Sequence, residues 1–492
     1  MKPILYWCFI GHLFLLNGIV FPQQNSFWAF DSLMLRFDWN GIVSLDSSHS
    51  SKLSSETAIS SENGSWNYYT GVNNINIFNG GIYNENNQLI HASTDLNMSR
   101  TYSSCKFLPF YGSNSIGFVS QRMNPATLEF QTWYHEIDHS TRQLVQKNIP
   151  LNPSGIKNKG GVASIRHGNG RDWWVITRQI FGTGFLVYYC REGGCIMDSV
   201  YNIGSYTGID GFVGGKGWGG GVLADPAGNF IIHFSQEGLI EQMLFNRCTG
   251  ELRFYRTISP AQTGDKRVQY FGCLSPTGKV LYISNTDKEI ANGTIEQYDL
   301  SVVNVASSKY IVFTTNINEE PKGIQPAPDG KVYFSYSNTN VNDTSATGYL
   351  HVIHNPDVMG VGCGLQLKSI YLNGNMIGYR VLPGFSNYYL GAIPNSLCDT
   401  LGLSNQNLIQ SPQIDLYPNP ATEKIYLDWP DGPSHFALRI FDSSGKLMQQ
   451  ECVENTGKQS IPLIKYPAGI YMLQVEDERG RRINRRFGVS EK

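Results

Sequence analysis

The sequence has few charged residues, and its charges nearly cancel. Asp, Glu, Lys and Arg make up 16% of the 492 residues, and the formal net charge is −2, whereas about a quarter of an average protein is charged. So small a net charge argues against a general attraction to nucleic acid, which requires a basic surface. Long apolar runs are also rare, and none beyond the N-terminus approaches the ~18 residues of a spanning helix, so we expect no transmembrane segment in the mature chain.

The one long apolar run, residues 4–16, lies at the N-terminus behind the positive charge of Lys2. Its length is typical of the hydrophobic part of a secretory signal peptide. A membrane-spanning helix would need about 20 apolar residues, and Asn17 and Pro22 end this run earlier. We therefore predict a signal peptide over residues 1–22, with an uncleaved anchor as the alternative.

Helical periodicity is absent as well, since no stretch of helical length repeats its apolar residues every three to four positions. The chain instead contains 51 glycines, 12% aromatic residues and 41% hydrophobic residues. That composition can form a substantial core and favours short strands joined by turns. The sequence predicts an all-β protein.

A degenerate repeat occupies the middle of the chain, in which a Pro-x-Gly turn precedes an apolar strand. It occurs at residues 225–234, 275–284 and 327–336, and its glycines, Gly228, Gly278 and Gly330, are 50 and 52 residues apart. A unit of this length holds about four strands, as a propeller blade does. Residues 27–398 have room for about seven units, so we predict a seven-bladed β-propeller.

The last part of the chain has a different pattern. Residues 399–411 are polar and predict a linker, and residues 412–492 hold seven short apolar segments separated by turn residues. Short strands at such regular spacing are typical of a small β-sandwich. We expect an Ig-like sandwich over residues 412–492.

Four motifs in this last part resemble those of the C-terminal sorting domain (type A) of proteins exported by the bacterial type IX secretion system. The motifs contain a Leu-Tyr-Pro-Asn-Pro entry, a Gly-Lys hairpin, a Pro-Ala-Gly-Ile-Tyr strand start and a final Arg-Phe-Gly-Val. Their characteristic residues here are Tyr417, Pro418, Asn419, Pro420, Gly445, Pro467, Gly469, Tyr471 and Phe487. The chain departs from the family in its density of arginines near the end. We interpret these arginines as a solvated face of the domain or as a contact to the secretion machinery.

The resemblance implies a route and a partner. Residues 412–492 would bind the type IX secretion machinery after signal-peptide export to the periplasm, and the product would be secreted or held at the cell surface. The larger part of the chain resembles the WD-repeat-like propellers of such exported proteins, in the repeat strands and in residues 247–250 and 382–385. Those propellers share no uniform activity.

Nine cysteines are present, and Cys8 lies within the signal peptide. The other eight would reach an oxidising compartment, where disulfides form. Cys190 and Cys195 flank a short Glu-Gly-Gly turn and are the first candidate pair, and Cys248 and Cys273 are the second. The alternative is that all of them are small buried hydrophobic residues.

Two short sequence patterns match the motifs of a metal site and of a cofactor site. Residues 135–139 match the His-Glu-x-x-His pattern of zinc proteases, which requires a helix, but the flanking Gln, Thr, Trp and Tyr residues predict a strand. In a strand His135 and His139 would lie about 13 Å apart, too far to share a zinc ion. Gly215, Gly217 and Gly220 have the spacing of a dinucleotide fingerprint without the strand and helix that it needs. We therefore expect no metal and no cofactor.

The tryptophans are the last candidates for binding. Trp133, Trp173, Trp174 and Trp218 could stack on sugar rings, or they could pack between blades. Trp173 and Trp174 are adjacent and must point to opposite faces of a strand, so at least one belongs to the core.

The sequence thus predicts an exported binding or interaction protein, whose ligand is unknown and could be a glycan or a protein. The alternative is an extracellular hydrolase or lyase acting on polysaccharide or peptide. Such an enzyme would need two carboxylates, or a histidine and a carboxylate, close together at one end of the propeller.

Overall fold

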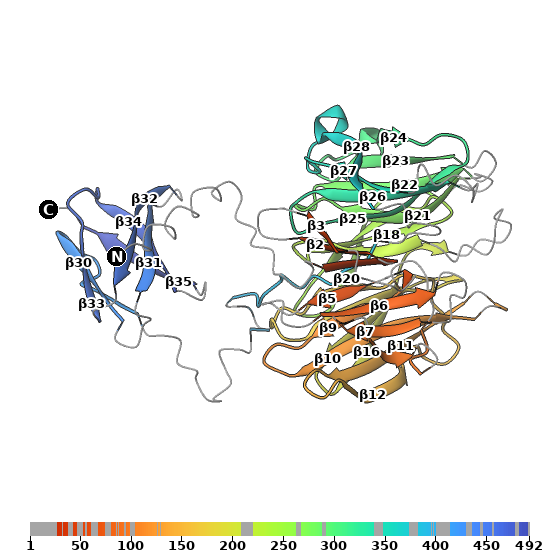
Figure 1. Cartoon of the computed structure of the whole chain (residues 1–492), viewed down its shortest axis with the longest axis horizontal. Coiled ribbons are helices and arrows are strands. Elements are labelled where there is room, and N and C mark those ends of the chain that lie inside the picture. Colours follow the sequence, from red (N-terminus) through yellow and green to blue (C-terminus); the bar gives the residue numbers. More distant parts are fainter. Residues whose placement is uncertain are drawn as a thin grey trace. The chain divides into compact units, whose positions relative to one another are not determined.

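The structure is a computed structural model that describes residues 27–490 with gaps, the longer ones at 38–42, 47–52, 61–66, 74–79, 99–103, 208–219, 262–266, 288–291, 339–347, 373–381, 400–413, 430–434 and 478–481. The predicted signal peptide, most of the predicted linker, Gly215, Gly217, Trp218 and Gly445 lie outside the described residues. The chain divides into two compact units, the larger extending to Gly402 and the smaller including Leu403–Lys492 (Figure 1).

The larger unit contains five four-stranded antiparallel sheets, each built from consecutive strands. Their strands are β9 (Lys106–Pro109), β10 (Ser115–Met123), β11 (Phe130–Asp138) and β12 (Gln143–Pro150); β13 (Ala163–Arg166), β14 (Trp173–Arg178), β15 (Gly182–Arg191) and β16 (Gly194–Thr207); β17 (Gly220–Ala224), β18 (Phe230–Ser235), β19 (Ile240–Phe245) and β20 (Leu252–Ser259); β21 (Arg267–Leu274), β22 (Val280–Asp287), β23 (Asn292–Asp299) and β24 (Tyr310–Thr314); and β25 (Glu319–Pro326), β26 (Val332–Asn338), β27 (Tyr349–Ile353) and β28 (Leu365–Tyr371).

A sixth, larger sheet comes from the N-terminal part of the chain. It comprises β1 (Phe27–Asp31), β2 (Leu33–Phe37), β3 (Val43–Asp46), β4 (Leu53–Ser54), β5 (Ala58–Ser60), β6 (Asn67–Asn73), β7 (Gly80–Asn84) and β8 (Leu89–Ala92). The helical elements within the described residues are two short 3-10 turns, η3 (Val305–Ser308) and η4 (Gly360–Cys363). The prediction of an all-β protein is confirmed.

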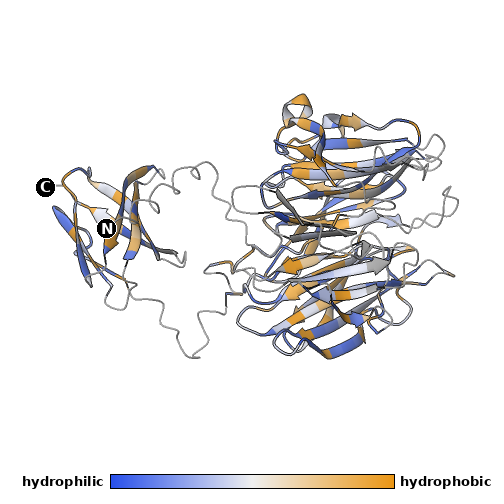
Figure 2. Ribbon diagram, viewed as in Figure 1, coloured by the Kyte–Doolittle hydropathy of each residue, from blue (hydrophilic) through white to orange (hydrophobic). Residues whose placement is uncertain are grey.

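The sheets are the blades of a β-propeller. β5 of the N-terminal sheet contacts β9, and from β9 the first strands of successive sheets contact one another in chain order through β13, β17 and β21 to β25. Apolar residues alternate with hydrophilic ones along many of the strands (Figure 2). A radial arrangement of this kind leaves only short sheet edges exposed, which limits pairing with other chains.

The predicted glycine turns connect the first two strands of three blades. Gly228, Gly278 and Gly330 have φ angles of 75°, 74° and 78°, which an L-residue with a side chain adopts only at a cost. In each turn the glycine amide donates to the carbonyl three residues earlier, with N–O distances between 2.8 and 3.0 Å. The repeat seen in the sequence is therefore a repeat of blade turns.

The first strands of the chain pack against the last blade. Trp28 of β1 is fully buried, and its ring centroid lies 5.8 Å from that of Tyr333 in β26. Leu35 and Phe37 of β2 join the same apolar cluster, together with Leu350 of β27. The two ends of the propeller sequence thus share one core, which closes the ring.

Deleting residues 27–46 should destabilise the whole propeller. The deletion removes Trp28, Leu35 and Phe37 from this shared core, and burying each such side chain contributes about 1.5–3 kcal/mol. We expect a single thermal transition, because the ring unfolds as a unit. Its melting temperature should fall by about ten degrees or more, since on the order of 5 kcal/mol of unfolding free energy is lost. Calorimetry would test this, and an unchanged melting temperature would contradict closure of the ring by these strands.

The smaller unit consists of two sheets that enclose one core. One sheet holds β29 (Asp415–Tyr417), β30 (Lys424–Asp428) and β33 (Lys458–Pro462), and the other holds β32 (Leu447–Glu454), β31 (His435–Asp442), β34 (Gly469–Asp477) and β35 (Arg482–Val489). These seven strands coincide with the seven predicted segments. Ile425 and Leu427 from the first sheet pack with Leu438, Leu473 and Phe487 from the second.

Among the described residues, no helix has the length and apolar character needed to cross a membrane.

Candidate functional site

The Tyr-Pro-Asn-Pro motif of the smaller unit is held against the last strand, β35. The Asn419 side chain accepts a hydrogen bond from the Gly488 amide at 2.8 Å and donates one to the Arg486 carbonyl at 3.1 Å. Ala421, directly after Pro420, pairs in parallel with Val489. Because β35 is at the edge of its sheet, this segment covers part of an edge that would otherwise be exposed.

A second group of motif residues meets beside the same strand. The rings of Tyr471 and Phe487 are stacked with centroids 5.6 Å apart, and the Tyr471 hydroxyl donates to the Pro467 carbonyl at 2.8 Å. Gly469 begins β34 and pairs with Val489 of β35. The structure therefore brings together, around β34 and β35, the motif residues Asn419, Pro420, Pro467, Gly469, Tyr471 and Phe487.

Tyr417 lies on the other sheet, in an exposed aromatic group. Lys458 Nζ is 4.9 Å from the ring centroid of Tyr417 and 4.3 Å from that of Tyr426. A hydrogen bond to Tyr417 raises the pKa of Lys458, and a hydrogen bond from Lys424 lowers the pKa of Tyr426. Sequence reasoning missed both lysines. Lys458 reaches the two rings from β33, and such cross-strand neighbours can be identified only once the strand register is known. Lys424 lies two residues before Tyr426 in β30, on the same face of that strand, so its signal was local.

One face of the second sheet carries apolar side chains in an exposed position. Ile470 and Met472 of β34 are 53% and 40% exposed, and Met448 of β32 is 39% exposed. Arg486 of β35 is exposed and lies opposite Met472 in the strand register. Together with the motif residues, this face offers a protein partner an apolar surface beside a positive charge.

In the larger unit, residues 382–398 form a segment that we call the plug. The plug lies outside the blade sheets and runs across the first strands of several blades. Ser386 Oγ bonds to Ser164 Oγ of β13 at 2.6 Å and donates to the Phe107 carbonyl of β9 at 2.8 Å. Asn387 donates to the Asp225 carbonyl at 2.7 Å, and Tyr388 is buried against Trp173.

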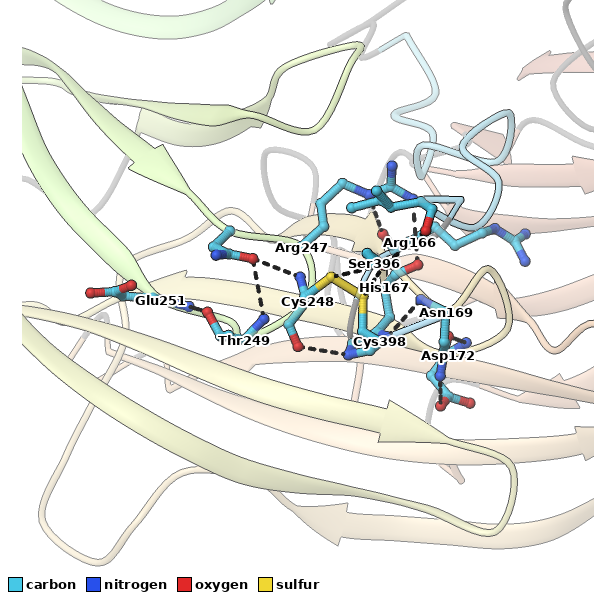
Figure 3. Close-up of a disulfide and its surroundings, with 12 residues drawn as sticks. Arg166, His167, Asn169, Asp172, Arg247, Cys248, Thr249, Glu251, Ser396 and Cys398 are labelled. Carbon is cyan, nitrogen blue, oxygen red and sulfur yellow. Dashed lines mark hydrogen bonds between the residues drawn. A yellow bond between two sulfur atoms is a disulfide. The ribbon is translucent and has the colours of Figure 1, made fainter. Parts of the chain in front are cut away.

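The plug ends at a disulfide between Cys398 and Cys248 (Figure 3). This pairing corrects the candidate pair Cys248 and Cys273, because Cys273 is a buried free thiol in β21. Both sulfur atoms lie over Gly168. A Cβ atom at that position would be 2.4 Å from Cys398 Sγ and 2.8 Å from Cys248 Sγ, so only glycine leaves room for the disulfide.

Hydrogen bonds from His167 and Arg247 fix the turn that carries Cys248. His167 Nδ1 accepts from the Asn169 amide, so its Nε2 can donate to the Cys248 carbonyl at 3.1 Å. The Arg247 guanidinium donates to the carbonyls of Arg166, His167 and Gly391, the last of which belongs to the plug. Burial lowers the pKa of Arg247 to about 10, which leaves it charged at neutral pH.

The structure also joins Cys190 to Cys195, the first candidate pair, across the hairpin between β15 and β16. Among the described residues, Cys273 and Cys363 are buried free thiols.

The His-Glu-x-x-His segment lies in strand β11 and the turn after it, as its composition predicts. Both ring nitrogens of His135 are hydrogen-bonded, Nε2 to Ser120 Oγ at 3.0 Å and Nδ1 to the Asn148 amide at 3.1 Å. Burial lowers the pKa of His135 to about 3. His139 instead bonds to Tyr68, so the two imidazoles have separate partners.

Trp173 and Trp174 point to opposite faces of β14, and both are buried. Trp173 packs toward the preceding blade and Trp174 toward the following one. The sequence required only one of the two tryptophans to belong to the hydrophobic core, and in the structure both belong to it. Because both rings are buried, neither can stack on a sugar. Trp133 is half-buried, so part of its surface is accessible.

A charged cluster lies buried between the second and third of the four-stranded blades. Lys159 pairs with Glu237 at 3.2 Å, and His233 lies 3.8 Å from Glu241. Glu241 also accepts hydrogen bonds from the amide and hydroxyl of Ser205. The cluster includes the histidine and carboxylate that a hydrolase would need, but these side chains are at most 4% exposed and bind protein groups.

Comparison with known proteins identifies the smaller unit. The model of the secretion system C-terminal sorting domain matches residues 415–489. No curated protein matches the chain.

Solved structures similar to the chain are distant from it. The periplasmic gluconolactonase PpgL of Pseudomonas aeruginosa is 9% identical, with 83% of this chain and 98% of that chain covered and a TM-score of 0.37. The β-propeller domain of Cps50 (Swd1) from Myceliophteria thermophila is 10% identical, with coverages of 63% and 92% and a TM-score of 0.36. A protein from Lactobacillus plantarum is 12% identical, with coverages of 83% and 98% and a TM-score of 0.38.

Proposed function

We propose that the protein is a β-propeller binding protein that the type IX secretion machinery carries across the outer membrane to the cell surface or the medium. The observation that carries this proposal is the sorting domain at residues 415–489. Its motif residues stabilise the final strand from two sides, through Asn419 and through the Tyr471–Phe487 stack. The machinery would recognise this folded end of the chain.

The proposal includes the finer architecture. We infer seven blades, in which the N-terminal sheet supplies two, β1–β3 and β5–β8, beside the five four-stranded sheets. The domain limits would be 27–398 for the propeller, 399–411 for the linker and 412–492 for an Ig-like sorting domain.

Fusing residues 399–492 to an unrelated folded reporter with a signal peptide tests the export part. In a cell with this secretion system, the fusion should reach the surface or medium, because the sorting domain encloses a core of its own. Its matched control carries Phe487→Asp, which places a charge in that core. Equal export of the fusion and its control would contradict the proposal.

For the propeller we propose ligand binding without catalysis, the ligand being a glycan or a protein. The plug covers the end of the ring that carries the turns at Gly170 and Gly228, so the ligand would bind elsewhere on the ring. A hydrolase or lyase is the second candidate, favoured only by the His233–Glu241 pair. If the purified propeller turned over a polysaccharide or a peptide, that result would support the hydrolase or lyase and contradict binding without catalysis.

A further inference from the structure

The Cys248–Cys398 disulfide lies near the C-terminal end of the described residues of the larger unit. Cys398 is the last residue of the plug, and between it and Ile414 of the sorting domain the structure describes only Asp399. Among the described residues, Cys398 is therefore the first covalent link to a blade that a force applied to the sorting domain meets.

The plug alone would resist such a force poorly. It is held by separate backbone hydrogen bonds, such as those from the Asn387 amide to Ser164 and from the Ile393 amide to Gly168. The strands of a blade, in contrast, are joined by continuous ladders of hydrogen bonds, as β19 is to both β18 and β20. Separate contacts can break one after another from the pulled end, whereas a ladder loaded as a unit opens cooperatively.

The disulfide directs the force into such a ladder. Cys248 lies in the turn between β19 and β20, and the Gly250 amide closes that turn by donating to the Asn246 carbonyl at 2.8 Å. The Trp174 indole holds the same turn from the neighbouring blade, donating to the Arg247 carbonyl at 2.7 Å. Force that reaches Cys248 is therefore shared between two blades.

We propose that the Cys248–Cys398 disulfide is a mechanical anchor, which transfers the pull on the sorting domain to the blade of β17–β20 and keeps the plug in place during export. The inference rests on the proposed function, because the pull arises when the secretion machinery moves the protein by its sorting domain. The second disulfide, Cys190–Cys195, lies within a single hairpin and carries none of this force.

Single-molecule pulling on the full mature chain tests the anchor. One handle is attached at exposed Tyr255 of β20 and the other at the C-terminus, and C248S/C398S is compared with the matched control C190S/C195S. In C248S/C398S we expect an additional early extension of about 60 Å, the length of the released plug at ~3.5 Å per residue. The control should lack this step.

The same early step in both variants, or in neither, would overturn the proposal. If C248S/C398S does not fold, the folded C190S/C195S protein can be reduced while it is held in the trap, and the step should then appear on reduction. Amide exchange at Asn387 and Ile393 provides a second measurement, and we expect it to be about tenfold faster without the Cys248–Cys398 bond. Unchanged exchange would contradict the anchor.

Export measurements separate this inference from the proposed function. If the anchor acts in cells, C248S/C398S should deliver several-fold less intact propeller to the exterior than C190S/C195S does. Equal delivery by the two variants would contradict the role of the anchor in export. Export of a chain that lacks residues 412–492 would instead contradict the proposed function, and the pulling result would be unaffected.

Discussion

A chain lacking residues 412–492 should remain in the periplasm of the producing cell. The predicted signal peptide should still direct its export across the inner membrane, but the sorting domain that matches residues 415–489 is gone. In vitro the propeller should melt at nearly the same temperature as in the full chain, because the deleted residues form a core of their own. Fractionation of cells and medium, together with calorimetry of the purified protein, would measure both effects.

Deleting only residues 481–492 should block export equally well. This removes β35, which pairs with β34 along its whole length and contributes Phe487 and Val489 to the core. The matched control is Gln450→Ala, at an exposed position of the same sheet, and it should be exported normally. If either truncated chain appears in the medium at the full-length level without cell lysis, the assignment of residues 412–492 as the export address is wrong.

The propeller should lose most of its stability between pH 6.5 and pH 4. Burial lowers the pKa of three histidines, to about 3 for His135 and about 4 for His233 and His351. In the unfolded chain each titrates near 6.5. Below that pH the unfolded state takes up protons that the folded state does not, so stability is complete above pH 6.5 and falls as the pH drops.

The expected decrease in the free energy of unfolding is large. Each histidine costs about 1.4 kcal/mol per pH unit below 6.5, or roughly 3 kcal/mol at pH 4, and the three together on the order of 10 kcal/mol. Urea unfolding from pH 7.5 to 4 would measure it. Replacing His351 by Asn, whose side-chain oxygen can accept the Lys368 amide in place of Nδ1, should reduce the slope by about a third.

The matched control for His351 is His354, three residues away and exposed. Replacing His354 by Asn should leave the slope unchanged. A flat stability profile between pH 6.5 and pH 4, or equal effects of the two substitutions, would contradict burial of neutral histidines as the cause.

Local features of the fold could be predicted from the sequence. The glycine turns at Gly228, Gly278 and Gly330 have the expected left-handed backbone, because glycine is the residue that adopts it at least cost. The seven strands of the smaller unit were predicted because short apolar segments recur there at regular spacing between turn residues. Strand composition likewise placed His135 in β11 rather than on a helix.

Features that depend on contacts between distant residues could not be predicted. Cys248 and Cys398 are 150 residues apart and meet only because the plug crosses the ring, and neither cysteine has a local pattern that indicates this pairing. The plug has no strand periodicity, so its residues resemble a loop in the sequence. The plug is held in the ring by hydrogen bonds between distant residues. One of them joins Ser386 to the Phe107 carbonyl, and these two residues are 279 positions apart in the sequence.

The position of the plug in the chain determines when the propeller can complete its fold. Residues 382–398 are among the last of the larger unit to be synthesised, yet they bond to β9 and β13 near its beginning. Contacts so distant in sequence form late, because the intervening chain must be ordered first. We therefore expect the docking of the plug to be one of the last steps in the folding of the larger unit.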